Sequence, residues 1–300
     1  MAPLPARLLV LALATDFTAM KSSHQEDCPD IGVACASSSP PRSYRHELVN
    51  YAYGATFDVQ YGVVRWLTLA ATIPYRAVTT KVHYADLAGN DYDPVPPDTH
   101  HRNRTITGLG DPTLAIVAGR ALGKVGFSVR VGAMLPLGRT LDEDPFVAGR
   151  EGRVHEHVQF GAGSVRPIVG SALGYDFGAV GVDGWFSATL SLADDAIGYR
   201  PGQRIAGGAR VSSALGASNA RFGLGAEVAH ETSETWRGLR PEEGNLGRTD
   251  VLAVATARWS PFARFGLFGV VKVPVLVDAI GAQLSYPFVV QLGVATGLGL

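Results

Sequence analysis

The sequence lacks the features that would assign it to several common protein classes. No uninterrupted apolar run reaches the length of about 18 residues typical of a membrane-spanning helix, and helix-period segments with capping boxes are nearly absent. The formal net charge of −1 predicts no nucleic-acid partner, because phosphate binding needs a concentrated positive field. With 36 glycines and 18% charged residues, the chain matches neither a disordered protein nor a helical membrane protein. These absences indicate an all-β chain.

The clearest pattern lies in residues 46–76, HELVNYAYGATFDVQYGVVRWLTLAATIPYR. Large apolar residues such as Tyr51 and Phe57 alternate with polar ones such as Asp58, and the alternation resumes after a turn at 62–65. Because side chains alternate faces along a strand, this segment predicts a hairpin with one apolar and one polar face. Each arm holds about 10 alternating residues, the length of a tilted strand that crosses a bilayer.

The same unit recurs along the chain. Aliphatic positions alternate with polar or glycine positions at 125–135, 180–192, 221–228, 250–259, 264–272 and 288–294. A β-sandwich also alternates, but it does not place polar, glycine-rich positions inside and aliphatic ones outside over nearly every strand. The pattern predicts an all-β fold, a single antiparallel transmembrane β-barrel formed by residues 1–300, in contact with the lipid of the outer membrane.

Connections between the predicted strands alternate in length, and the short ones lie at 62–65, 122–124, 177–179, 216–218 and 260–263. Outer-membrane barrels place short turns on the periplasmic side and long loops outside, and their strand number is usually even. The strand that begins near His46 ends in a short turn, so an upward strand should precede it. Residues 7–20 are the candidate, which gives about 12 strands and makes residues 21–45 the first external loop.

The same N-terminal segment also resembles a secretory signal peptide. Arg7 precedes a short apolar run at 8–14, but no small-residue cleavage site separates this run from Asp16 and Phe17. The strand interpretation implies that the export signal lies outside the sequence given. The sequence leaves both interpretations open.

The first predicted loop contains the two cysteines of the chain, Cys28 and Cys35. In an exported protein a close pair within one loop favours a disulfide. A metal site is the alternative, because His24, Asp27 and His46 lie in or beside the same loop. Six residues separate the cysteines, whereas zinc motifs usually have about two to four, so the disulfide is the stronger interpretation.

Histidines gather in the predicted loops and at strand ends. His155 and His157 are two residues apart, so on an extended strand they would share a face and could hold a metal ion with Glu151 or Glu156. Solvated loop histidines are the simpler explanation. The Ser/His and Asp/His groups of outer-membrane phospholipases and proteases have no recognisable counterpart, so the sequence predicts neither an enzyme nor a cofactor.

The polar face of the predicted barrel carries the main functional information. We expect it to line the lumen with charges of both signs, arginines in excess, at Asn50, Asp58, Arg76, Asp111, Arg130, Asp183, Arg204, Arg210, Arg221, Glu227, Asp250, Arg258, Arg264 and Lys272. Charged side chains at membrane depth persist only in protein or water-lined interiors, so these residues either pair across the lumen or line an aqueous path. A barrel of about 12 strands is compatible with both. We expect Asp111 to pair with Arg76 or Arg130.

The segment TGLGDPTLAIVAGRAL at 107–122 resembles a strand motif of outer-membrane barrel proteins associated with the meta-pathway of phenol degradation. Further segments are similar in the same order: WLTLAATIPYR, VGAMLPLGR, VQFGAGSVRPIVG and the closing GAQLSYPFVVQLGVATGL. The resemblance covers residues 46–300. It implies a first strand before His46, which favours the strand interpretation of residues 7–20, and it implies passage of a small molecule across the outer membrane.

Together these patterns predict an outer-membrane channel or transporter for passive uptake of a small aromatic or anionic solute. The alternative is a barrel with a plugged lumen, whose external Cys and His loops bind a metal or a partner.

Overall fold

The computed structural model describes residues 3–26, 44–94, 101–216, 219–241, 244–280 and 285–299, and its main feature is one closed antiparallel barrel. The strands of the wall are β1 (Leu8–Glu26), β2 (Tyr44–Val64), β3 (Leu67–Asp86), β4 (Arg104–Leu109), β5 (Thr113–Leu122), β6 (Val125–Met134), β7 (Arg166–Asp176), β8 (Val180–Thr189), β10 (Arg204–Ala214), β11 (Ala220–Thr232), β13 (Gly247–Phe262), β14 (Phe265–Ala279) and β15 (Val289–Gly299). Both β4 and β5 pair with β3 and act as one interrupted strand, so the barrel has 12 strands. The predicted fold class is confirmed.

The first strand closes the barrel. β1 pairs with β15 on one side, where Leu8 lies opposite Gly299, and with β2 on the other. β1 continues to Glu26, six residues beyond the predicted end at residue 20, and β2 begins at Tyr44. The expected external loop at 21–45 is therefore too long at both ends. The predicted end of β1 rested on its apolar segment, but β1 stays paired with β2 beyond that segment, as far as Glu26 opposite Tyr44.

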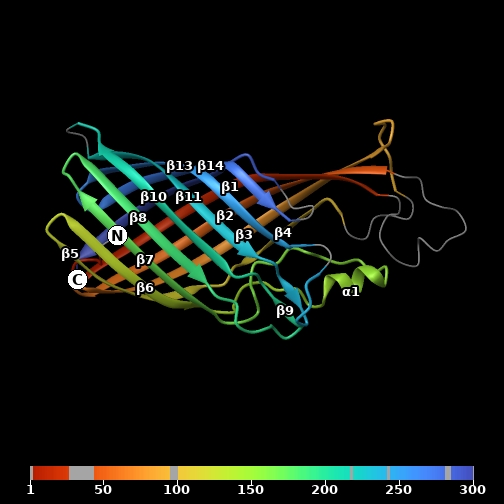
Figure 1. Cartoon of the computed structure of the whole chain (residues 1–300), viewed down its shortest axis with the longest axis horizontal. Helices are drawn as coiled ribbons and strands as arrows, with labels where there is room; N and C mark the ends of the chain where they lie inside the picture. Colours follow the sequence, from red (N-terminus) through yellow and green to blue (C-terminus); the bar gives the residue numbers. More distant parts are fainter. Residues whose placement is uncertain are drawn as a thin grey trace, which may run out of the picture.

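Short and long connections alternate around the barrel as the sequence predicts. β2–β3, β5–β6, β7–β8, β10–β11 and β13–β14 are joined by short turns at one end, which we call the short-turn end. The longer connections gather at the opposite, long-loop end, and Figure 1 shows them on the right with the chain termini on the left. By the rule for outer-membrane barrels, the short-turn end faces the periplasm.

The strands differ in length around the wall. β1, β2 and β3 have 19, 21 and 20 residues, whereas β5, β6 and β8 have 10 each. A strand needs about 9–11 residues to cross the bilayer, so the first three extend beyond it at the long-loop end.

The GLGDP segment interrupts the wall between β4 and β5. Leu109 faces outward at an odd position, and Leu114 and Ile116 face outward at even positions, so the break reverses the alternation. Pro112 has no N–H for the ladder, and Gly110 instead donates to the carbonyl oxygen of Pro74 at 2.9 Å. The break turns Asp111 away from the outer face.

The outer wall is a continuous apolar surface. Ile116, Val131 and Leu224 are 50, 55 and 59% exposed although they lie in the middle of strands. Such side chains require an apolar surrounding, because exposed apolar patches of this extent are rare on soluble monomers. No helix among the described residues is long and apolar enough to span a membrane.

Small elements order the long-loop end. The helix α1 (Pro145–Arg150) begins after Asp144, whose carboxylate accepts hydrogen bonds from the backbone N–H groups of Phe146 and Val147 at 2.9 and 3.3 Å. Proline at the first helical position has no N–H to leave unsatisfied. Two short strands, β9 (Tyr199–Arg200) and β12 (Thr235–Trp236), pair in a separate ribbon.

Candidate functional site: the barrel lumen

The best-defined ion pair of the lumen joins Arg210 on β10 to Asp183 on β8. The two residues are cross-strand partners, and Nε and Nη2 of Arg210 donate to the two carboxylate oxygens of Asp183 at 3.2 and 3.0 Å. This arrangement gives the bidentate geometry in which arginine binds carboxylates most strongly. Both residues were predicted to line the lumen, and the structure brings them together.

Two further pairs lie on the inner face of β11, β13 and β14. Lys272 Nζ lies 2.6 Å from the Glu227 carboxylate across the intervening strand β13, and the Glu227 side chain is almost fully buried. Asp250 pairs with Arg248 at 2.8 Å, two residues away on the same face of β13. Arg248 was not among the predicted lumen residues.

The inner face of β1, β2 and β3 holds a third group. Arg76 Nη1 donates to Asp16 on β1 at 2.8 Å, and both side chains pass over Gly54 of the intervening β2. The hydroxyl of Thr72 donates to Asp58 at 2.5 Å. Asp16 was missed from sequence, although a carboxylate in an otherwise apolar strand needs a partner at membrane depth.

Two remaining predicted residues lie beside this group. Asn50 is buried and accepts a hydrogen bond from Thr80 at 2.7 Å, which satisfies its amide oxygen on the inner wall. Arg130 on β6 has Asp58 as its acidic neighbour, but among the described residues the two form no ion pair. The inner wall is therefore polar but largely neutralised by pairing.

The expected partner of Asp111 is wrong. Its carboxylate, with a fully buried side chain, lies 3.4 Å from Arg166 on β7, not beside Arg76 or Arg130. It also accepts the backbone N–H groups of Gly138 at 3.0 Å and Ala162 at 2.8 Å. The GLGDP break moves Asp111 out of the strand register on which the sequence argument relied, so it binds a loop and the first residue of β7 instead of Arg76 or Arg130.

That loop, residues 135–165, contacts the inner side of the wall at its two ends, and we call it the inward loop. It contains α1 and lies against the inner side of β4, where Arg139 and Phe160 contact the backbone at Gly108. Glu156 forms an ion pair with Arg104 of β4. The two ends of the inward loop therefore lie against the inner side of the wall at Gly108 and Asp111.

His155 and His157 belong to the inward loop and not to a strand, so the expected shared strand face is absent. Their rings are nevertheless adjacent, with centroids 5.0 Å apart. Burial, together with the positive charge of neighbouring groups, lowers the pKa of His157 to about 3, which keeps it neutral. Within the described ranges, no three His, Cys, Asp or Glu residues are arranged to hold a metal ion.

Four predicted lumen residues lie toward the barrel ends. Arg204 is more than half exposed at the long-loop end, 3.7 Å from Glu231. Arg264 lies in the turn between β13 and β14, so its expected place on the inner wall is wrong: β14 begins at Phe265, one residue later than the alternation suggests. Arg221 and Arg258 face the lumen at the short-turn end.

The predicted pair Cys28 and Cys35 lies outside the described residues.

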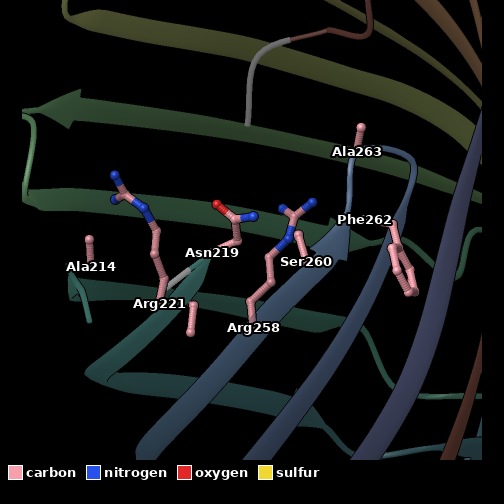
Figure 2. Close-up of a pocket in the computed structure, with 8 residues that line it drawn as sticks. Ala214, Asn219, Arg221, Arg258, Ser260, Phe262 and Ala263 are labelled. Atoms are coloured by element: carbon pink, nitrogen blue, oxygen red, sulfur yellow. The ribbon is translucent and has the colours of Figure 1, made fainter. Parts of the chain in front are cut away.

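The lumen contains open space toward the short-turn end. A cavity of about 610 Å³ is bordered by β5, β6, β7, β8, β10, β11 and β13, and its lining includes Trp185, Arg210 and Arg221. A second cavity of about 510 Å³ at the short-turn end is lined by Arg221, Arg258 and Ser260, among others (Figure 2). Arg221 borders both, so the two cavities lie next to each other at this side chain.

The closed 12-strand barrel, its apolar outer wall and its charged interior define an outer-membrane β-barrel protein. No family model matches the chain, and a search of curated proteins finds no match. Among solved structures, an outer membrane channel from Pseudomonas putida F1 is similar with a TM-score of 0.64 and 13% identity, over 99% of this chain and 97% of that one. At this identity the similarity shows the fold alone.

Two other solved structures are less similar. A mutant of the TodX monoaromatic hydrocarbon channel has a TM-score of 0.48 and 6% identity, over 99% of this chain and 91% of that one. The NanC porin has a TM-score of 0.44 and 8% identity, over 94% of this chain and all of that one. The resemblance to the phenol-degradation barrel family stays a hypothesis, because no family model matches.

Proposed function

We propose that the chain is a channel for passive passage of small solutes across the outer membrane. The observation that carries this proposal is the cavity of about 610 Å³ in the lumen, which lies beside the cavity of about 510 Å³ at the short-turn end. A plug of side chains would fill this space. The volume is that of a site for one small molecule, and not of the wide aqueous pore found in barrels of about 16 to 18 strands.

The pairing of charges supports passage. Asp183, Glu227 and Asp250 each have a basic partner within 2.9 Å, so most of the wall presents hydrogen-bonding groups without a large uncompensated charge. Such a wall can replace part of the hydration of a polar solute without trapping it. No residue on the wall is proposed to perform catalysis.

The inward loop is the proposed constriction of the path. It is tied to the wall at Asp111 and at Arg104, and its contacts lie on the inner face of β4. Solutes that enter from the long-loop end must pass beside it, which favours small ones. The alternative function, a plugged barrel whose loops bind a metal or partner, is supported by the adjacent His155 and His157 alone.

Swelling of proteoliposomes tests the proposal. The refolded barrel should admit glycerol and arabinose faster than protein-free liposomes, and the rate should fall steeply for sucrose because of the narrow lumen. Folding is confirmed by heat-modifiable electrophoretic mobility. Folded, inserted protein that admits none of these solutes would contradict the channel and favour the loop-binding alternative, which zinc titration of the same sample would then examine.

A further inference from the structure

Arg221 and Arg258 form an unusual like-charge pair at the short-turn end. They lie directly opposite each other on the adjacent strands β11 and β13. Like charges placed directly opposite on neighbouring strands destabilise a sheet, so a barrel gains nothing in stability from this arrangement. A ligand of opposite charge would turn the same arrangement into an attractive site.

The two arginines have weaker acidic partners than Arg210 and Lys272, the paired cations on neighbouring strands. Arg210 and Lys272 lie 2.9 and 2.6 Å from carboxylates. Arg221 is 4.0 Å from the exposed Asp176 and donates to the carbonyl oxygen of Gly178 at 3.0 Å. Within the part of the chain that the structure describes, Arg258 forms no ion pair and donates no hydrogen bond.

The cavity that both arginines line offers donors to a small anion. They line a cavity of about 510 Å³, together with Asn219 and Ser260. Figure 2 shows both guanidinium groups pointing to the same side of the wall, with the amide of Asn219 between them. Guanidinium groups bind carboxylate and phosphate oxygens through two parallel hydrogen bonds, and the amide and the hydroxyl add further donors.

The surroundings at the short-turn end reinforce this preference. Among the described residues within two positions of a short turn, basic side chains outnumber acidic ones. The basic ones are Arg65, Lys124, Arg221 and Arg264, and the acidic one is Asp176. A mouth lined mainly by one sign of charge concentrates ions of the opposite sign. The whole chain is close to neutral, so this excess is local.

We propose that Arg221 and Arg258 form a binding site for small carboxylate-bearing solutes at the exit of the lumen. Because Arg221 also borders the larger cavity, a solute there can reach this site directly. Trp185 lines the larger cavity and offers an aromatic surface beside the path, so aromatic carboxylates fit both parts. The inference deepens the proposed channel function and rests on it for its physiological meaning.

Equilibrium binding of an anion tests the arginine site even if the barrel does not conduct ions. Isothermal calorimetry on detergent-solubilised, folded barrel would use benzoate, with inorganic phosphate as a second oxyanion and benzyl alcohol as a neutral analogue. We expect benzoate to bind, and the double variant Arg221→Gln/Arg258→Gln to bind it at least about 10-fold more weakly, as loss of charge-assisted hydrogen bonds predicts. Arg264→Gln, which removes a cation from the adjacent turn, is the matched control and should bind like the unaltered protein.

Each outcome separates the site from the channel. Phosphate binding with the same dependence on both arginines would support the site and extend it to other oxyanions. Equal binding of benzoate and benzyl alcohol, or unchanged benzoate binding in the double variant, would overturn the proposal. Benzoate binding by a barrel that fails the swelling assay would retain the site and reject the channel, whereas swelling without benzoate binding would do the reverse.

Discussion

Asp111 holds the inward loop in the barrel, and replacing it with Asn should release that loop. The carboxylate accepts hydrogen bonds from the N–H groups of Gly138 and Ala162 and lies beside Arg166, with no exposed surface. In the Asp111→Asn variant the charge is lost, and the new NH₂ group must face one of these donors. A buried cation is then left without its anion.

The cost can be approximated from these contacts. Hydrogen bonds to a charged group contribute about 1.5–3 kcal/mol each, and removing one partner of a buried ion pair costs about 3–5 kcal/mol. Because Asn keeps one acceptor oxygen, we expect opening of the inward loop to become easier by about 2–4 kcal/mol. That change corresponds to roughly 30- to 700-fold faster hydrogen exchange at the backbone amides of Gly138 and Ala162, measured by mass spectrometry.

The control is Asp278→Asn, which removes an exposed carboxylate near the end of β14. It should leave exchange in the inward loop unchanged. If the amides of Gly138 and Ala162 exchange at the original rate in a folded Asp111→Asn barrel, the inward loop does not depend on this carboxylate. The account of its anchoring would then be refuted.

Two further predictions concern the long-loop end. Burial raises the pKa of Glu234 to about 7 from the ordinary value of 4.5, so its contribution to stability is complete below pH 4.5 and is lost as the pH rises to about 7. Melting temperatures should therefore fall over this interval, and less so in Glu234→Gln; equal slopes would contradict the assignment. Asp144→Ala removes the N-cap of α1 and should cost about 1 kcal/mol, seen as about 5-fold faster exchange at Ala148. Unchanged exchange there would show that packing alone holds the helix.

The barrel could be predicted from sequence because one physical rule governs almost every strand. Lipid requires an apolar outer face and the lumen accepts polar groups, so alternation in segments such as 46–76 gives both the strands and their orientation. Connection lengths then order the strands, and the resulting barrel of 12 strands agrees with the structure. Strand ends were less certain, as Arg264 shows, because turns carry no such constraint.

The partners of the inward residues could not be derived in the same way. Arg76 pairs with Asp16 two strands away, because Asp16, Gly54 and Arg76 lie opposite one another across β1, β2 and β3 and Gly54 has no side chain to separate the other two. Asp111 binds the inward loop, whose path depends on long-range contacts. The helix α1 did have a local sequence signature, Asp144 followed by Pro145, which is typical of a helix start.

Single-channel conductance in a planar bilayer tests the open lumen most directly, when adjacent residues of β10 are compared. Ser212 lines the larger cavity, whereas Ser213 is exposed on the outer face. The account predicts current steps for the unaltered barrel that fall by at least about half in Ser212→Trp, because an indole would occupy much of the cross-section, and persist in Ser213→Trp. Steps that are equal in both variants, or silence from folded and inserted protein, would contradict a path through this cavity.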